Sequence, residues 1–268
     1  MIPHVLSIAG VDPSGGAGVL ADLKAFSALG AYGTGVVTAL TAQNTRMVAG
    51  VHPVPPGFIA EQIDTLFADL RIDAVKIGML GTAEIVETVA DRLHRHGVKR
   101  LVVDPVMVAK SGDRLLAAAA VAALRRRLVP MAEVLTPNLP EAADLLGEPA
   151  AASLEAMRGV ARRLHALGPR LVMLKGGHLA GAESIDIVDD GERQVELHAP
   201  RIATRNTHGT GCTLSAAIAA LLPRERSPID AIRAAKTYLS AAIAAADELA
   251  VGHGHGPVHH FHAWWPRG

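Results

Sequence analysis

A short glycine-containing turn is the part of the sequence best suited to bind an anion. Residues 206–212 read NTHGTGC and lead into the alanine-rich residues 213–222. Gly209 and Gly211 permit backbone conformations that a Cβ atom would forbid. The first N–H groups of the following helix lack partners within it and lie at the positive end of its dipole. They could hold a phosphate or a developing oxyanion, but a glycine loop before a buried helix gives the same pattern.

Cys212, the only cysteine, would lie in the first turn of that helix. The positive field there is expected to favour the thiolate over the thiol. A single cysteine also excludes an intramolecular disulfide and is typical of a reducing compartment. Cys212 is therefore a candidate reactive group beside a candidate anion site.

Three charged side chains lie just beyond the ends of apolar runs that are expected to be strands. Asp104 follows Leu101–Val103, Lys175 follows Leu171–Leu174, and Glu141 starts a helix. The carboxyl ends of parallel strands meet at the ligand-binding edge of an open α/β sheet, where Lys175 could reach a phosphate. Asp104 could bind Mg²⁺ or cap a helix, and Glu141 could pair with Asp104 or serve as a first-turn charge.

A second glycine-rich loop, residues 10–18 (GVDPSGGAG), follows the apolar run Val5–Ala9. Its spacing matches neither the dinucleotide-binding fingerprint nor a Walker A loop. The glycines allow either close approach of a small ligand or a tight turn without one. Gln43 comes after another run, residues 35–40. Its amide could recognise the edge of a heterocycle or belong to an ordinary polar turn.

The candidate residues are connected by apolar runs that alternate with amphipathic stretches. This pattern predicts an α/β fold with a mainly parallel sheet and helices on both faces, undivided by any linker. The sequence DDG at 189–191 predicts a hairpin and hence an antiparallel edge. Residues 47–54 are a candidate edge strand, and a loop is expected over 106–113. The expected strands are 5–9, 35–40, 74–78, 100–104, 134–136, 171–174, 185–188 and 194–197, and the expected helices are 19–29, 59–70, 85–93, 115–128, 141–146, 154–167, 213–222 and 228–249.

The overall composition narrows the class of protein. The 26 Lys and Arg residues balance 26 Asp and Glu residues, which argues against non-specific binding to nucleic acid or anionic membranes. No run approaches the roughly 18 apolar residues of a spanning helix, and the first residues lack a signal-peptide pattern. We therefore expect a cytoplasmic protein that binds neither nucleic acid nor membrane. Five histidines between 253 and 262 could bind a metal or belong to a docked loop.

Eight segments, spread over nearly the whole chain, form a specific pattern through their order and spacing. They are AGVDPSGGAG (9–18), TALTAQNT (38–45), KIGML (76–80), VDPVM (103–107), TPNLPE (136–141), LKGGH (174–178), NTHGTGCT (206–213) and GPVHHFH (256–262). The chain thereby resembles the hydroxymethylpyrimidine/phosphomethylpyrimidine kinases of thiamine biosynthesis, within the ribokinase-like superfamily. The resemblance implies one kinase domain over residues 1–268. It also implies a three-layer α/β/α sandwich whose central sheet is mostly parallel with an antiparallel edge.

The resemblance further implies an activity and a ring-binding site. The chain would phosphorylate 4-amino-5-hydroxymethyl-2-methylpyrimidine to the monophosphate and then to the diphosphate, using ATP and Mg²⁺. Gln43 would read the aminopyrimidine edge, and Asp22 would contact the hydroxymethyl or amino group. Asp104 and Glu141 would support Mg²⁺. The pyrimidine would lie among Gly10, Ala17, Asp22, Gln43, Met79 and Val106.

The same resemblance places ATP across the carboxyl edge of the sheet and implies a homodimer. Lys175 would act in catalysis near the phosphates, with Asn206 and Thr207 beside it. The anion hole and the remaining catalytic groups would be Gly209, Thr210, Gly211 and Cys212.

Cys212 occupies the position where sugar kinases of this superfamily usually carry an aspartate base. A thiolate there could take the alcohol's proton in the first transfer. The second acceptor is already a phosphate monoester anion, so it needs little deprotonation near neutral pH. A pyridoxal or pyridoxine kinase of the same fold, and a catalytically silent pyrimidine-binding protein, remain as alternatives.

Overall fold

The structure, a computed structural model, describes residues 1–108 and 116–266. Its centre is a nine-stranded sheet with the strand order β3-β2-β1-β4-β5-β6-β7-β8-β9. The strands are β1 (His4–Val11), β2 (Tyr32–Gln43), β3 (Val48–Pro53), β4 (Ala74–Ile77), β5 (Leu101–Val103), β6 (Val134–Leu135), β7 (Leu171–Leu174), β8 (Glu183–Asp189) and β9 (Gln194–Pro200).

The six central strands are parallel, as the sequence predicts. The predicted hairpin is confirmed, because β8 pairs antiparallel with both β7 and β9. The candidate edge strand at 47–54 is confirmed as β3, which pairs antiparallel with β2. The sheet therefore has antiparallel strands at both edges, whereas the predicted hairpin indicated an antiparallel edge on one side only.

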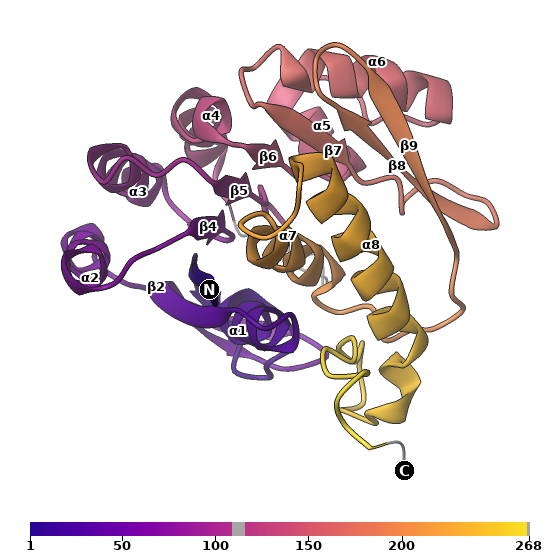
Figure 1. Cartoon of the computed structure of the whole chain (residues 1–268), viewed down its shortest axis with the longest axis horizontal. Helices are drawn as coiled ribbons and strands as arrows, with labels where there is room; N and C mark the ends of the chain where they lie inside the picture. The colour runs from indigo at the N-terminus through magenta and orange to yellow at the C-terminus, as the bar shows by residue number, and fades with distance from the viewer. Residues whose placement is uncertain (109–115, 267–268) are drawn as a thin grey trace.

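Helices cover both faces of the sheet, which gives the three expected layers (Figure 1). α1, α7 and α8 pack on one face, and α2 to α6 pack on the other. The helices are α1 (Gly18–Ala28), α2 (Pro56–Asp69), α3 (Ala83–Arg95), α4 (Ala118–Arg127), α5 (Leu139–Leu146), α6 (Leu154–His165), α7 (Thr210–Leu221) and α8 (Pro228–Ala244), with short 3₁₀ turns at Val129–Met131 and Ala246–Glu248.

Two apolar cores hold these layers together. Successive side chains of a strand point to opposite faces, so Leu6 and Ile8 of β1 join the core under α2 to α6, while Val5 joins the core under α1, α7 and α8. The alanines of 216–220 in α7 are all buried. Their small side chains let this helix lie close to the sheet, and its first turn therefore reaches the ends of the central strands.

The order of the strands creates a crevice beside β1. The chain builds β2 and β3 on one side of β1 and then returns to place β4 on the other side. Ligands of open α/β sheets bind outside the carboxyl ends of the strands at such a reversal of order. The glycine-rich loop after β1 and the residues after β4 both lie at this point.

The histidine-rich tail is a docked loop. His208 forms a parallel bridge with Pro257, and the backbone N–H of His259 donates to the carbonyl of Ala242. Within residues 1–108 and 116–266, no group of three or more His, Cys, Asp or Glu side chains could hold a metal ion. Across the same residues, no helix is long and apolar enough to cross a membrane. Residues 109–113 of the predicted loop, and residue 115 at the start of a predicted helix, lie outside the described residues.

Candidate active site

Two adjoining cavities lie at the carboxyl ends of the parallel strands. The first cavity, about 460 Å³, is lined by the loop after β1, by residues after β4 and β5, and by the start of α7. The second cavity, about 390 Å³, is lined by residues of β8, β9 and α8. Both are lined by Asn138, Lys175, His178, Thr207, Thr210 and Gly211.

Five of the six residues predicted to surround the pyrimidine line the first cavity. These are Gly10, Ala17, Gln43, Met79 and Val106. A Cβ atom on Gly10 would lie 2.5 Å from the Cε atom of Met79. The glycine therefore lets the Met79 side chain lie against the backbone of the first loop.

Asp22 was expected to contact the ring directly, but the structure places it away from both cavities. Its side chain is fully buried and does not line either cavity, because the Lys76 Nζ lies 2.9 and 2.8 Å from its two oxygens. The Ser7 hydroxyl also donates to Asp22 at 2.5 Å. Lys76, in contrast, lines the first cavity. The structure thus places a lysine where the sequence indicated the aspartate, with Asp22 behind it.

Lys76 stays charged in this buried position. Burial opposes its charged form, but the carboxylates of Asp22 and Asp104 outweigh burial and raise the pKa of Lys76 above its usual range. Sequence reasoning missed this residue. The available signal was a lone charge in the buried strand Ala74–Ile77.

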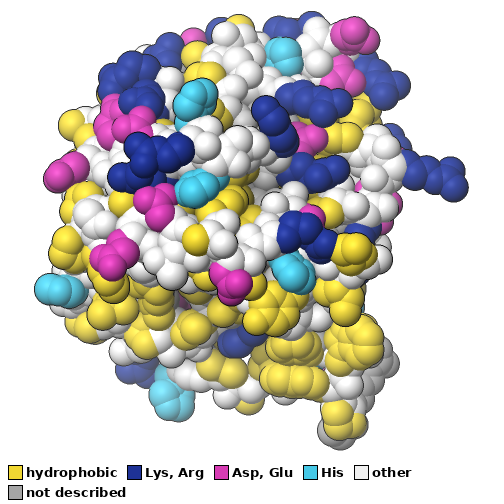
Figure 2. Space-filling model, turned by 60° about the vertical axis from the view of Figure 1, so that its left-hand side comes forward, with side chains coloured by type: hydrophobic (Ala, Val, Ile, Leu, Met, Phe, Trp, Pro, Cys, Tyr) yellow, Lys and Arg dark blue, Asp and Glu magenta, His cyan; other side chains and the backbone are white. Residues whose placement is uncertain are grey.

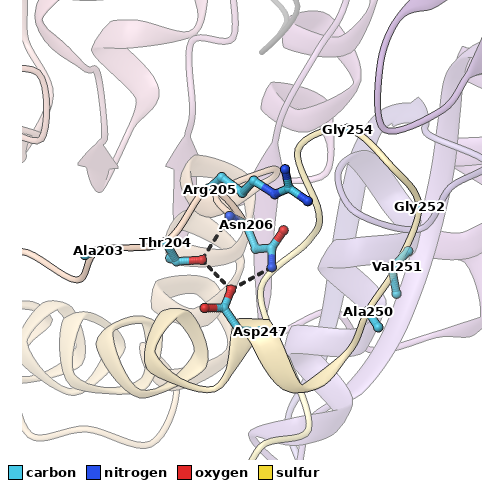
Figure 3. A pocket seen from close by; sticks show the side chains of 9 residues that line it. All are labelled: Ala203, Thr204, Arg205, Asn206, Asp247, Ala250, Val251, Gly252 and Gly254. Carbon is cyan, nitrogen blue, oxygen red and sulfur yellow. Dashed lines mark hydrogen bonds between the residues drawn. The ribbon is translucent and has the colours of Figure 1, made fainter.

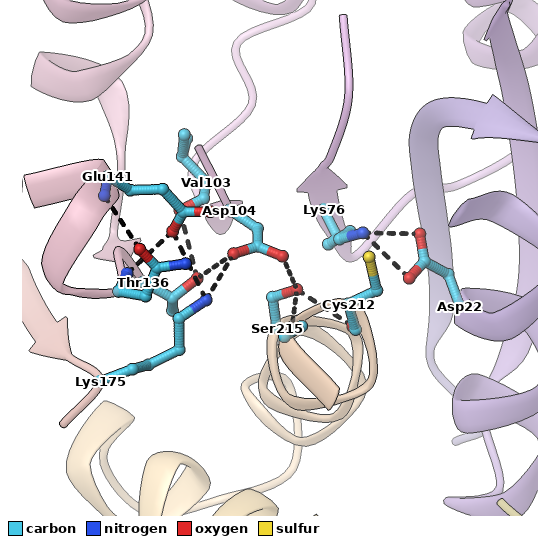
Figure 4. A network of polar contacts seen from close by, with 11 residues as sticks. Asp22, Lys76, Val103, Asp104, Thr136, Glu141, Lys175, Cys212 and Ser215 are labelled. Atoms are coloured by element: carbon cyan, nitrogen blue, oxygen red, sulfur yellow. Dashed lines mark hydrogen bonds and ion pairs between the residues drawn. The ribbon is translucent and has the colours of Figure 1, made fainter. Parts of the chain in front are cut away.

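Asp104, Glu141 and Lys175 come together on the wall of the first cavity, as predicted, and Lys175 also lines the second cavity (Figure 4). The Lys175 Nζ lies 2.9 Å from Asp104 Oδ1 and 3.8 Å from Glu141 Oε2. The hydroxyl of Ser215, in α7, donates to Asp104 Oδ2 at 3.1 Å. Strand ends and α7 therefore fix this acid–lysine cluster from two sides of the sheet edge.

The two carboxyl groups have opposite pKa shifts. Burial opposes the ionisation of Asp104, but Lys175 and Lys76 outweigh it and hold the pKa of Asp104 below its usual range. Burial raises the pKa of Glu141 to about 7, with Lys175 opposing the rise and Asp104 adding to it. Asp104 and Glu141 attract Lys175 strongly enough to overcome its burial and raise its pKa. The lysine therefore remains a cation beside the two carboxyl groups.

Glu141 also forms a capping box at the start of α5. The Asn138 side chain accepts from the Glu141 backbone N–H at 2.9 Å, and the Glu141 carboxyl accepts from the Asn138 backbone N–H at 2.8 Å. Both roles proposed for Glu141 from the sequence, the first-turn charge and the partner of Asp104, therefore coexist. Asp104 caps none of the helices in residues 1–108 and 116–266, and residues 104–107 after β5 have no regular structure.

The glycine turn is shaped by close backbone contacts. Gly209 caps α7 with a φ of 74°, in the left-handed region, and a Cβ atom there would lie 1.7 Å from the Gly16 carbonyl oxygen. A Cβ atom on Gly211 would lie 3.2 Å from the Lys175 Nζ. Thr210, Gly211 and Cys212 line the first cavity. The first turn of α7 thus meets the lysine and the first loop at one place.

Cys212 is a neutral thiol at physiological pH. Burial raises its pKa to about 11, although Lys76 and the Gly18 backbone N–H act in the opposite direction. The sequence-based expectation of a thiolate is therefore wrong. Partial burial disfavours the charged thiolate more than the start of the helix favours it, and the carboxylates of Asp104 and Asp22 add to this effect.

Thr207 lines both cavities, but Asn206 lines neither. Asn206 lies instead in a third cavity, about 540 Å³, beside the tail (Figure 3). Its side chain donates to Asp247 Oδ1 at 2.7 Å and accepts from the Gly256 backbone N–H at 3.1 Å. Of the residues expected near ATP, Asn206 therefore lies outside both of the first two cavities and holds the tail against the turn.

Two further polar residues of the first cavity were missed by sequence reasoning as functional residues. Asp12 and His208 lie 2.7 Å apart, measured from Oδ2 to Nε2, and both are buried. Each belongs to one of the two glycine-rich segments. The proximity of these segments depends on the positions of β1 and α7, which local sequence does not reveal.

The sheet order and the two helical layers agree with the ribokinase-like fold that the sequence predicts. The family model for phosphomethylpyrimidine kinase matches residues 12–259. The hydroxymethylpyrimidine/phosphomethylpyrimidine kinase of Escherichia coli K12 is 56% identical over 98% of each chain. The corresponding Rhizobium meliloti protein is 55% identical over 99% of each chain. The chain belongs to the phosphomethylpyrimidine kinase family.

Solved structures share the fold but span two substrate classes. A Bacillus subtilis pyridoxal kinase in complex with ADP superposes with a TM-score of 0.91 and 36% identity, covering 98% of this chain and 99% of its own. A Clostridium difficile phosphomethylpyrimidine kinase has a TM-score of 0.80 and 40% identity, covering 90% of this chain and 99% of its own. The backbone alone therefore does not distinguish the two substrates.

Proposed function

We propose that residues 1–268 form a single ATP-dependent kinase domain that phosphorylates 4-amino-5-hydroxymethyl-2-methylpyrimidine to its monophosphate and then to its diphosphate in thiamine diphosphate biosynthesis. One observation carries the proposal: the first cavity joins the predicted ring contacts to the acid–lysine cluster and the glycine turn. The names of the Escherichia coli and Rhizobium meliloti relatives support the choice of substrate.

The pyrimidine occupies the part of the first cavity between Gly10, Met79 and Val106. Gln43 has both an amide donor and a carbonyl acceptor, which suit the edge of an aminopyrimidine. Lys76 adds a fixed positive charge, and Cys212 adds a small neutral group. The acceptor oxygen would then face the start of α7.

ATP extends from the acid–lysine cluster into the second cavity. Its base would contact the apolar wall that Pro200, Ile202 and Leu239 contribute to that cavity. Lys175 and Thr207 line both cavities, so they are suited to contact the phosphates. The ADP bound to the Bacillus subtilis pyridoxal kinase is consistent with nucleotide binding to this fold.

Asp104 and Glu141 suit Mg²⁺ by the chemistry of their oxygens. Mg²⁺ in kinases is usually held by one or two carboxylates together with substrate phosphates and water. These two carboxyl groups lie beside the same lysine, which is where the phosphates would bind. When bound, the ion would neutralise charge on the phosphates.

The chain contributes chiefly position and charge to the transfer. Phosphoryl transfer requires little covalent chemistry from a protein. The backbone N–H groups that begin α7, together with Lys175, stabilise charge on the transferred group. Cys212 is proposed as a positioning group, because its neutral thiol is a poor base at physiological pH.

Pyridoxal kinase activity is the second candidate, favoured by the close superposition on the Bacillus subtilis enzyme. Steady-state kinetics with ATP and Mg²⁺ would compare kcat/KM for hydroxymethylpyrimidine and for pyridoxal. The proposal requires a higher kcat/KM for the pyrimidine. A higher value for pyridoxal would reject it, and absence of ATP consumption with either would favour a silent binding protein.

A cytoplasmic homodimer is the proposed assembly. β3 is an edge strand, and all of its residues after Val48 are exposed. Leu40 and Val51 are 51% and 47% exposed on β2 and β3. Figure 2 shows hydrophobic side chains gathered in the lower half of one face. A second copy would cover such a surface.

Light scattering tests the proposed homodimer. It should give twice the chain mass of 27.9 kDa, and a monomer would contradict the proposal.

A further inference from the structure

The carboxylate of Asp12 binds two parts of the chain that are far apart in sequence. Its Oδ1 accepts from the Ser14 backbone N–H at 2.9 Å and from the Ser14 hydroxyl at 2.7 Å. Its Oδ2 accepts from the Ala17 backbone N–H at 3.0 Å and contacts the His208 Nε2 at 2.7 Å. Asp12 is 3% exposed and His208 is 6% exposed. One buried carboxylate therefore organises the first loop and also binds the turn before α7.

The direction of the contact between these two side chains follows from charge. Burial opposes ionisation of Asp12, but hydrogen bonds from His208 and Ser14 outweigh it and hold the pKa of Asp12 below its usual range. A carboxylate only accepts hydrogen bonds. The His208 Nε2 therefore carries the hydrogen and donates, which fixes the orientation of the ring.

The backbone around His208 is fixed as well. Its N–H donates to the Gly256 carbonyl at 3.0 Å, which ties the turn to the docked tail. Its ring lies on the first loop, where a Cβ atom on Gly16 would be 2.3 Å from the His208 Cδ2. A Cβ atom on the next residue, Gly209, would likewise lie only 1.7 Å from the Gly16 carbonyl oxygen. The loop and the turn therefore meet in a tight contact that only glycines allow.

We propose that Asp12 and His208 form a positioning latch, which sets the distance between the pyrimidine's acceptor oxygen and the glycine turn. This inference rests on the proposed function. Asp12 holds Ala17, which lines the side of the first cavity where the ring binds, while His208 precedes the turn that binds the transferred group. An error of about 1 Å between reacting groups can cost about 100-fold in rate. The latch therefore acts on kcat more than on the binding of ATP.

The test compares His208→Asn, His208→Gln and a control, His260→Asn. The side-chain amide nitrogen introduced by His208→Gln can reach Asp12, whereas the shorter side chain introduced by His208→Asn cannot. His260 is also a buried histidine, 4% exposed, bound to Thr213 of α7 at 3.0 Å, but it lines neither cavity. Activity is followed as kcat and KM for each transfer. Alkylation of Cys212, the only cysteine, by iodoacetamide reports the contact between loop and turn without requiring activity.

In His208→Asn, kcat for both transfers should fall about 10- to 100-fold, as expected for misplaced reacting groups, while KM for ATP changes less than about 3-fold. Alkylation of Cys212 should become faster. His208→Gln should recover most of the rate, and His260→Asn should lower stability with kcat unchanged. Asp12→Asn should reproduce the effects of His208→Asn, and it replaces that variant if His208→Asn does not fold.

Unchanged kcat and unchanged alkylation in His208→Asn would overturn the latch. So would an equal loss of kcat in His260→Asn, which would indicate a general effect of destabilisation. If the unaltered chain transfers no phosphoryl group to the pyrimidine, the proposed function fails. The comparison of alkylation rates would still test the latch in that case.

Discussion

At the scale of single residues, the charge state of Cys212 decides between two roles in the transfer. A thiolate could act as a general base, whereas a neutral thiol could only position the acceptor. The position of Cys212 could be predicted from the turn that precedes it, but its pKa could not. The rise comes from burial and from the carboxylates of Asp104 and Asp22, which lie in distant segments of the sequence. A local dipole argument therefore predicted the wrong sign.

Replacing Cys212 with serine should change the rate of either transfer less than about 10-fold, because a neutral group that only positions the acceptor can be replaced by another. A general base typically contributes about 10²- to 10⁴-fold. Single-turnover measurements of each transfer would distinguish these cases. A loss of 100-fold or more confined to the first transfer would contradict the positioning role and support proton abstraction by the cysteine.

Glu141 should make stability depend on pH in a defined direction. Its pKa is about 7 in the folded chain, against an ordinary value of 4.5. The folded state therefore binds this proton more tightly, and its contribution to stability is full below about pH 4.5 and is lost as pH rises through 7. Replacing Glu141 with glutamine removes the cost of ionisation and keeps an oxygen that can accept from Asn138.

Urea unfolding of both proteins at about pH 5 and pH 8 would test this. Relative to the unaltered chain, Glu141→Gln should gain about 1–3 kcal/mol between the lower and the higher pH. A difference in unfolding free energy that is the same at both pH values would contradict the raised pKa.

At the scale of elements, β4 and α1 are joined by the Lys76–Asp22 ion pair, whose two side chains are fully buried. The sequence contained evidence for this pair. Asp22 lies three residues after Val19 and four before Phe26, so helical spacing places it on the buried side of α1. Two opposite charges at buried positions would be expected to pair. What the sequence could not provide was the packing of α1 on β1, which brings Asp22 within reach of Lys76 on the neighbouring strand β4.

Removing one partner of this pair should destabilise the chain strongly. Lys76→Met should lower the free energy of unfolding by about 3–5 kcal/mol, because a buried carboxylate loses its partner. The joint change of Lys76→Met and Asp22→Leu should recover most of that loss. Chemical denaturation would measure both. The exposed pair Arg158–Glu196 is the control, and Arg158→Met should cost less than about 1 kcal/mol.

Equal destabilisation by the single and the double change would contradict this account of the pair. It would indicate that shape, rather than charge pairing, governs the contact between β4 and α1. Because Lys76 also lines the first cavity, activity would fall in both variants and does not serve as the measurement.

At the scale of the whole molecule, the alternation of apolar runs and helices was sufficient to predict the parallel sheet and its two helical layers. The antiparallel pairing of β3 was harder to predict, because residues Ala49–Pro53 are exposed and carry little burial pattern. The site followed from strand ends, since Asp104, Glu141 and Lys175 meet where parallel strands end. The exceptions, Asp22 and Asn206, are residues whose polar groups are satisfied by partners from distant segments.

The central claim is that one site performs two successive transfers to a pyrimidine. Phosphorus NMR of the chain with ATP, Mg²⁺ and hydroxymethylpyrimidine tests it most directly. We expect the resonance of a phosphate monoester to appear first and then to be replaced by the two resonances of a diphosphate, with neither forming when Mg²⁺ is removed by chelation. A reaction that yields no phosphorylated pyrimidine, or that stops at the monophosphate with ATP in excess, would contradict the account.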